Sequence, residues 1–150
     1  MEPLLRLADV KKSFGDIQAI EHVSLDIYKN SVVGLVGGNG AGKTTLLRIM
    51  SGVYRPTEGS VTLGNNRPVT EMRSILGVVP ESTGLYSKLT AWENIRYHSR
   101  LHGIDDQLAW NRTYRFARLL DIEDSLHRYT EGFSRGMKQK TALLLSLIHI

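Results

Sequence analysis

The chain has 150 residues, with 19 lysines and arginines against 15 aspartates and glutamates, which gives a formal net charge of +4. This excess is too small and too dispersed to indicate a nucleic-acid-binding protein. Apolar residues make up 41% of the chain and charged residues 23%, which excludes a disordered or collagen-like protein and predicts one folded domain. The absence of cysteine excludes a disulfide framework and a thiolate metal site, and fits a reducing compartment.

No apolar stretch of the sequence is long enough to cross a membrane. The longest runs, residues 32–36 and 142–148, are much shorter than the roughly 18–20 residues that a membrane-spanning helix needs. Residues 1–10 carry charges within an apolar pattern and lack the layout of a secretory signal. We therefore expect a cytoplasmic protein that associates with a membrane only through a partner.

The chain before about residue 90 alternates short apolar runs with turn residues, which predicts a β-rich first half. Residues 31–36, SVVGLV, form a short apolar run interrupted by Gly34, which is typical of a buried strand. The expected elements are strands over residues 4–10, 22–27, 31–36, 60–63 and 75–80, and a helix over residues 44–50.

The pattern becomes helical after residue 90. Residues 90–93 read Thr-Ala-Trp-Glu, a capping box in which the Thr90 hydroxyl accepts the Glu93 amide while the Glu93 carboxylate reaches back. This motif predicts a helix to about His102, ended by Gly103. Further helices are expected from residue 105 or 106 to about 120, near residues 123–129, and from residue 134 onward.

The sharpest motif is Gly-Gly-Asn-Gly-Ala-Gly-Lys-Thr at residues 37–44, which fits G-x-x-x-x-G-K-[ST] at every fixed position. Glycines let backbone N–H groups approach a triphosphate closely, and the helix that follows adds its unpaired donors. Lys43 can reach the β- and γ-phosphates, and the Thr44 hydroxyl can hold Mg²⁺. The motif therefore predicts a nucleotide-binding loop, with a ligand-free glycine-rich turn as the alternative.

Further segments resemble the ATP-binding cassette (ABC) ATPases. Residues 37–45, GGNGAGKTT, are similar to the family's GPNGAGKTT with Gly38 in place of proline. Residues 12–15, KSFG, are similar to the A-loop, whose aromatic ring stacks on adenine, so the resemblance assigns that role to Phe14, with a core aromatic as the alternative. The resemblance assigns the phosphates and Mg²⁺ to Gly37, Gly38, Asn39, Gly40, Ala41, Gly42, Lys43, Thr44 and Thr45.

Residues 133–140, FSRGMKQK, resemble the family signature, usually LSGGQ, in the SxGMKQ form that is frequent among bacterial exporters. The resemblance implies that Ser134 and Gly136 act in trans on the γ-phosphate bound by a second ATPase subunit, identical or different. Residues 132–136 also fit the G-x-S-x-G elbow of serine hydrolases. That elbow needs a preceding strand and a following acid, and no Asp or Glu follows Ser134.

Residues 77–81, GVVPE, lie where these ATPases carry the Q-loop, and Glu81 stands in place of the usual glutamine. A carboxylate also ligates Mg²⁺, but it adds negative charge beside the triphosphate. The resemblance thus implies Lys43, Glu81 and Ser134 as catalytic residues, and Thr44 and Glu81 as metal ligands.

The resemblance implies an α/β fold, a P-loop NTPase of the ABC type. Its core would span about residues 1–89, its helical subdomain about 90–133, and its signature helix would begin at 134. The implied function is that of an ATPase subunit that uses ATP and Mg²⁺ and docks on integral-membrane permease subunits at the inner face of the cell membrane, near residues 86–90. It would power export and bind no nucleic acid.

Three other functions stay open as alternatives: a soluble tandem-cassette protein acting on the ribosome, a P-loop GTPase, and a remnant that binds ATP without turnover. The GTPase is disfavoured because the sequence has no Asn-Lys-x-Asp guanine motif. His98 and His102 could be taken for a metal pair, but an exposed polar face is the preferred interpretation. Arg112, Arg115 and Arg118 are likewise interpreted as a solvated helix face.

In the family, the Walker B aspartate, the catalytic glutamate, the D-loop and the switch histidine follow the signature helix, and none of them is found in these 150 residues. We therefore expect a fragment that folds marginally and at most binds ATP. Residues 145–150 equal an in-frame translation of a transposon adapter used in sequencing libraries. They match an apolar helical run of the family equally well, so both origins stay open.

Overall fold

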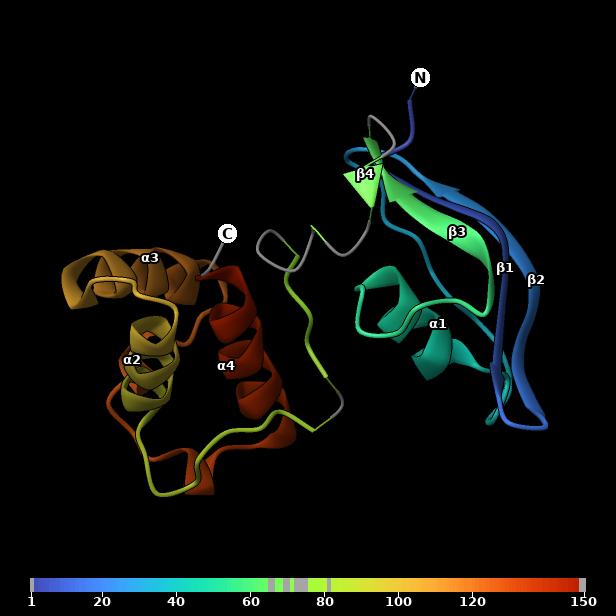
Figure 1. Ribbon diagram of the computed structural model, residues 1–150. Coiled ribbons are helices and arrows are strands. Elements are labelled where there is room, and N and C mark those ends of the chain that lie inside the picture. The colour runs from blue at the N-terminus through green and yellow to red at the C-terminus, as the bar shows by residue number, and fades with distance from the viewer. Residues whose placement is uncertain (1, 65–66, 69–70, 72–75, 81, 149–150) are drawn as a thin grey trace. The chain divides into compact units, whose positions relative to one another are not determined.

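The computed structural model describes residues 2–64, 67–68, 71, 76–80 and 82–148. Contacts within the chain divide it into two units, residues 1–74 and residues 75–150, which are drawn in Figure 1. The division into a core, a helical subdomain and a signature helix stays a prediction. Among the described residues, no helix combines the length and apolar character that a membrane crossing requires.

The first unit is built on a four-stranded antiparallel sheet. β1 (Leu5–Phe14) and β2 (Ile17–Ile27) form a hairpin, β3 (Glu58–Leu63) pairs with the other edge of β1, and β4 (Arg67–Pro68) pairs with β3. Three of the expected strands are thus confirmed, each in a longer form. Because side chains alternate along a strand, one face of the sheet is apolar. Its buried members include Leu5, Leu7, Val10, Ile20, Val61 and Leu63.

Helix α1 (Lys43–Met50) packs on the apolar face of this sheet (Figure 1). Leu46 and Ile49 lie three residues apart on one side of the helix and are 4% and 0% exposed. The helix expected over residues 44–50 is therefore confirmed. Its packing fixes where the preceding loop, residues 37–42, meets the sheet.

Two expected strands are wrong. Residues 31–36 and residues 76–80 join no ladder in the described part of the chain, and residue 75 lies outside it. Val32 and Val36 are 102% and 95% exposed. A strand exists only where another strand accepts its hydrogen bonds, and an apolar run of this kind needs neighbours on both sides. No described segment supplies them.

The second unit is helical. It contains α2 (Ala91–Leu101), α3 (Asp106–Leu119) and α4 (Arg135–Leu147), with two short 3₁₀ helices, η3 (Glu123–Ser125) and η4 (Thr130–Gly132). The core between the helices is formed by Ala91, Ile95, Ala109, Ala117, Ile122, Leu126, Phe133, Leu144 and Ile148.

The short helix expected near residues 123–129 is present only as the 3₁₀ helix η3, because the rest of this segment is held by backbone contacts with the start of α2. The Trp92 amide donates to the Leu126 carbonyl at 2.8 Å, and Tyr129 forms a bridge with Thr90. These long-range bonds take the groups that a continuous helix would pair within itself.

The capping box at the start of α2 is confirmed. The Glu93 amide donates to the Thr90 hydroxyl at 3.1 Å, and the Thr90 amide donates to the Glu93 carboxylate at 2.8 Å. This backbone hydrogen bond lowers the pKa of Glu93. Asp105 caps α3 by accepting from the amides of Gln107 and Leu108. Both helices therefore begin where local side chains satisfy their first amides.

The exposure of residues 31–36 can be tested by denaturation. Because Val32 and Val36 lack packing partners among the described residues, V32T and V36T should change the free energy of unfolding by less than about 0.5 kcal/mol. The matched core variant L7A should cost about 2–5 kcal/mol, because Leu7 is 2% exposed. Urea unfolding followed by circular dichroism measures both effects. A cost above about 1 kcal/mol for V36T would contradict the exposed conformation.

Candidate nucleotide-binding site

The loop at residues 37–42 ends in a glycine that no other residue can replace. Gly42 has φ +83° and is the N-cap of α1. A Cβ added there would collide with the carbonyl oxygen of Ala19 and lie 3.0 Å from Cδ1 of Ile20. Both the left-handed backbone and the close approach to β2 exclude an L side chain. The loop therefore lies against the sheet because residue 42 is glycine.

The start of α1 has unpaired hydrogen-bond donors. No side chain caps the start of this helix at Gly42, and its first turn contains no acidic residue. The first amides of a helix lack partners within the helix, and the helix dipole places partial positive charge at this end. An uncapped helix start next to a glycine-rich loop is an arrangement that binds anions.

The ammonium group of Lys43 lies over the same loop. Its Nζ donates to the carbonyl oxygens of Gly37 at 2.7 Å and of Gly38 at 2.6 Å. Thr44 is exposed and Thr45 half-buried at the start of the helix. The structure thus brings together the whole segment 37–45, with a cation, a hydroxyl and the free amides of α1 on one short stretch of chain.

Phe14 lies at the end of β1, where the hairpin turns, and pairs with Ile17. Its side chain is 44% exposed, so it is not a core aromatic. The ring meets Tyr54 edge-on, with ring centroids 5.5 Å apart. Sequence reasoning missed Tyr54, because this residue lies in an irregular turn after α1 that matches no motif.

Ser134 is the N-cap of α4, and its hydroxyl accepts the Met137 amide at 3.2 Å. Ser134 and Gly136 are exposed in the second unit. The helix η4, and not a strand, comes before them. This arrangement contradicts the serine-hydrolase elbow and leaves Ser134 at a helix start, as the signature resemblance implies.

A hollow of about 520 Å³ lies beside the start of α4. Arg135 and Lys138 bring two positive charges to it. The other residues of its lining are Ser82, Thr83, Gly84, Leu85, Ser87, Thr130 and Gln139. The hollow therefore combines cations and hydroxyl groups on the side of α4 that follows Ser134.

The predicted metal ligand Glu81 lies outside the described residues. Within the described ranges, no group of three or more His, Cys, Asp or Glu residues is placed to hold a metal ion. The donor set at the loop fits Mg²⁺ bound to a triphosphate, because amides and an ammonium suit phosphate oxygens and the Thr44 hydroxyl suits a hard cation.

His98 belongs to the packing of the second unit. Its Nε2 atom is buried without a hydrogen-bond partner, and the ring packs against Tyr86 and Tyr97 at centroid distances of 6.4 and 5.5 Å. Burial lowers the pKa of His98, and the neighbouring charge of His102 lowers it further. The interpretation of His98 as part of an exposed polar face is therefore wrong, because the aromatic rings desolvate it.

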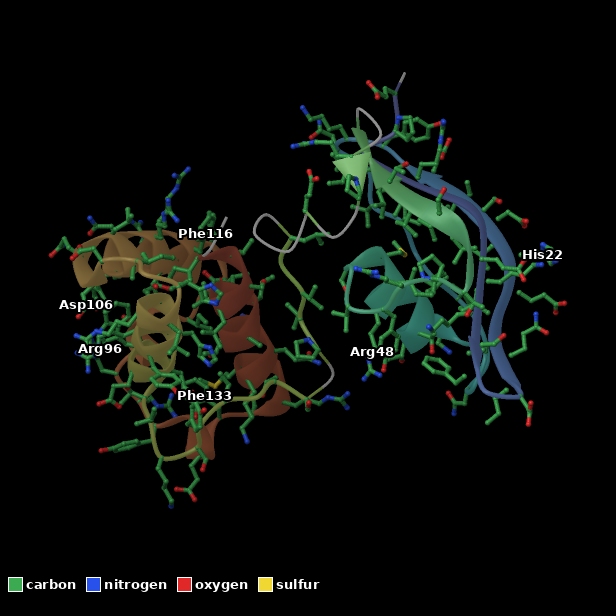
Figure 2. The ribbon with its side chains drawn as sticks, in the orientation of Figure 1. His22, Arg48, Arg96, Asp106, Phe116 and Phe133 are labelled. Atoms are coloured by element: carbon green, nitrogen blue, oxygen red, sulfur yellow. The ribbon has the colours of Figure 1, made fainter. Side chains whose placement is uncertain are left out.

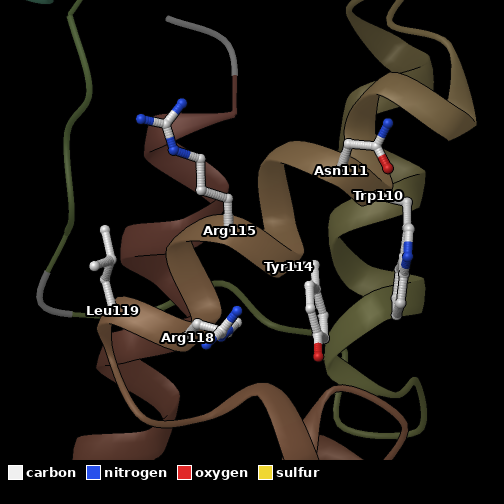
Figure 3. Close-up of a pocket in the computed structure, with 6 residues that line it drawn as sticks. All are labelled: Trp110, Asn111, Tyr114, Arg115, Arg118 and Leu119. Atoms are coloured by element: carbon white, nitrogen blue, oxygen red, sulfur yellow. The ribbon is translucent and has the colours of Figure 1, made fainter.

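The three arginines of α3 do not form one solvated face. Arg115 and Arg118 are exposed, but Arg112 is half-buried and donates to the Ile148 carbonyl at 2.9 Å, at the end of α4. A surface hollow of about 560 Å³ lies on α3, where the rings of Trp110 and Tyr114 stack, and its lining residues are drawn in Figure 3. The remaining lining residues are Asn111, Arg115, Arg118 and Leu119. This hollow contains none of the residues predicted to bind nucleotide.

The glycine-rich loop, the helix that it opens and the sheet beneath define a P-loop nucleotide-binding core in an α/β chain. Residues 20–149 match the protein family described as ABC transporter, and the chain belongs to that family. It is 36% identical to the ABC transporter ATP-binding protein NatA of Bacillus subtilis (strain 168), over 97% of this chain and 63% of NatA. It is 27% identical to the bacitracin transport ATP-binding protein BcrA of Bacillus licheniformis, over 99% of this chain and 49% of BcrA.

Solved structures agree with this assignment. The solved structure of an ATP-binding subunit of an ABC transporter matches this chain with a TM-score of 0.79 and 26% sequence identity. The match covers 97% of this chain and 62% of that subunit. CbiO1 from Clostridium perfringens, part of the ABC transporter complex CbiONQ, superposes with a TM-score of 0.85 over 99% of this chain and 62% of the CbiO1 chain. At 21% sequence identity, this match shows a likeness of fold. The chain spans about three fifths of the length of NatA and of these two structures.

Replacing Gly42 tests the steric constraint at the loop. G42A should lower the free energy of unfolding by at least about 2 kcal/mol, because a left-handed L residue costs roughly 1–2 kcal/mol before the collision with Ala19 is added. G38A is the matched control, since a Cβ at Gly38 meets open space, and should stay within about 0.5 kcal/mol. Urea unfolding measures the difference, and equal stabilities would contradict the close approach.

Acid titration tests the burial of His98. The unfolded chain takes up a proton near the ordinary pKa of 6.5, whereas the folded chain takes it up at lower pH, so stability should fall as the pH drops from about 7 towards 5. H98F keeps a ring and cannot titrate, so its stability should fall less steeply. Thermal unfolding at several pH values measures these slopes, and equal slopes for H98F and the parent would contradict the assignment.

Proposed function

We propose that this chain is the ATP-binding part of an ABC transporter ATPase subunit. The observation that supports the proposal most directly is the Lys43 ammonium, held by the Gly37 and Gly38 carbonyls at the uncapped start of α1. Membership of the ABC transporter family supports it independently.

On binding, the ammonium of Lys43 exchanges two carbonyl partners for the β- and γ-phosphate oxygens. This exchange favours binding because the phosphate oxygens carry negative charge, so the ammonium gains a Coulombic attraction that the neutral carbonyls do not provide. The amides of residues 37–45 surround the phosphates, the Thr44 hydroxyl ligates Mg²⁺, and Phe14 stacks on adenine. Bound Mg²⁺ neutralises the phosphate charge. These roles follow the resemblance residue by residue.

Ser134 and Gly136 would close the site of a second ATPase subunit. A serine hydroxyl has one donor hydrogen and two lone pairs, so Ser134 can accept the Met137 amide and still donate to a phosphate oxygen. The free amides at the start of α4 add to this contact. The dimer would then hold each nucleotide between the loop of one subunit and the signature of the other.

We assign ATP hydrolysis to a protein of the length of NatA and BcrA, with Glu81 sensing the γ-phosphate. Such a subunit would sit on the cytoplasmic face of the membrane, bound to permease subunits near residues 86–90, and nucleotide-driven closure would change the access of the permease. The proposed direction is export, and its support is the SxGMKQ form of residues 134–139.

Removing the Lys43 ammonium tests ATP binding. K43A should weaken the binding of Mg-ATP by about 10- to 100-fold, because charge-assisted hydrogen bonds contribute roughly 1.5–3 kcal/mol. K29A, which removes a lysine from a turn of the same unit and has the same net charge as K43A, should bind Mg-ATP as the parent chain does. Isothermal titration calorimetry gives both dissociation constants.

Two results would contradict the proposal. One is a parent chain that is folded by circular dichroism and takes up no Mg-ATP. The other is equal affinity for K43A and the parent, since the nucleotide would then bind without the loop.

A further inference from the structure

Four side chains form a small aromatic and cationic group at the turn end of the β1–β2 hairpin. The Phe14 cluster consists of Lys12, Phe14, Arg48 and Tyr54. The ammonium of Lys12 lies 4.9 Å from the centroid of the Phe14 ring and 5.9 Å from that of Tyr54. The rings of Phe14 and Tyr54 meet at 71°, an edge-on geometry typical of attractive aromatic pairs.

Both the backbone and the side chain of Arg48 hold Tyr54. The Tyr54 amide donates to the Arg48 carbonyl at 3.0 Å, and Nη1 of Arg48 donates to the Tyr54 hydroxyl at 3.1 Å. The guanidinium also lies 5.5 Å from the Tyr54 ring. Arg48 extends from α1 (Figure 2), so Tyr54 is fixed to the helix that begins at Lys43.

The same turn is fixed to the strand that carries Phe14. The Thr57 amide donates to the Lys11 carbonyl at 2.8 Å, and the Ser13 amide donates to the Thr57 hydroxyl at 3.0 Å. Tyr54 thus bridges α1 and the end of β1. Phe14 keeps 44% of its surface exposed although Tyr54 and Lys12 contact it, so the ring is oriented and still accessible.

We propose that Tyr54 is a positioning residue for the nucleobase, which it serves by fixing the plane of the Phe14 ring relative to α1. The inference rests on the proposed function. Because Arg48 and Lys43 lie on one short helix, Tyr54 links the ring that stacks on the base to the loop that binds the phosphates. Stacking uses the face of the base and not its hydrogen-bonding edge, so Tyr54 should support adenine and guanine nucleotides alike.

Calorimetry with three ligands separates base from phosphate binding. Y54L should weaken Mg-ATP and Mg-GTP binding by about two- to tenfold and leave Mg-tripolyphosphate within about twofold, since an edge-on aromatic pair is lost and the loop is not. Y54F keeps the ring and should restore most of the ATP affinity. Y28L, at a tyrosine of the same unit outside the Phe14 cluster, should bind all three ligands as the parent does.

A double-variant cycle shows whether Tyr54 acts through Phe14. In an F14L background, Y54L should cause no further loss of ATP affinity, because the ring that it positions is already gone. Additive losses would overturn the inference, as would equal weakening of ATP and tripolyphosphate by Y54L, or unchanged ATP binding. A parent chain that binds neither ligand would overturn the proposed function itself. Binding of tripolyphosphate without a base-dependent gain would overturn this inference alone.

Discussion

The close approach of Gly42 to the carbonyl oxygen of Ala19 determines where α1 begins. A left-handed residue at this point turns the chain from the loop into the helix, and only glycine fits beside β2. Burial of Leu46 and Ile49 then holds the helix on the sheet. The free amides of α1 are therefore placed by packing against the sheet, and the ammonium of Lys43 is held over the loop by the Gly37 and Gly38 carbonyls.

Two sides of helix α1 make different contacts. Its apolar side joins the core of the first unit, while Arg48 on another side contacts Tyr54. Since Tyr54 meets Phe14, this short helix connects the ring that we propose stacks on the base with the loop that we propose binds the phosphates. A rigid connection of this kind favours affinity, because the two contacts need no separate ordering when the ligand binds.

The second unit depends on a buried polar side chain. Asn94 is fully buried, accepts the Tyr86 amide at 2.8 Å and donates to the carbonyls of Tyr86 and Thr90. The Thr130 hydroxyl donates to the same Tyr86 carbonyl at 3.0 Å. A satisfied buried network specifies a single backbone arrangement. It therefore fixes the segment before α2, which the proposed function places near the permease.

The sequence by itself determined the features that depend on near neighbours. The capping box at residues 90–93 and the helix that begins after the glycine-rich loop were predicted correctly, because hydrogen bonds within four residues and glycine geometry decide them. Tertiary structure alone decided the rest. Residues 31–36 have the composition of a strand but find no ladder partner in the described part of the chain, Arg112 binds the distant Ile148 carbonyl, and Tyr54 reaches Phe14 across a turn. Strand pairing and the two side-chain contacts all involve segments far apart in the chain, and they depend on packing that no local pattern encodes.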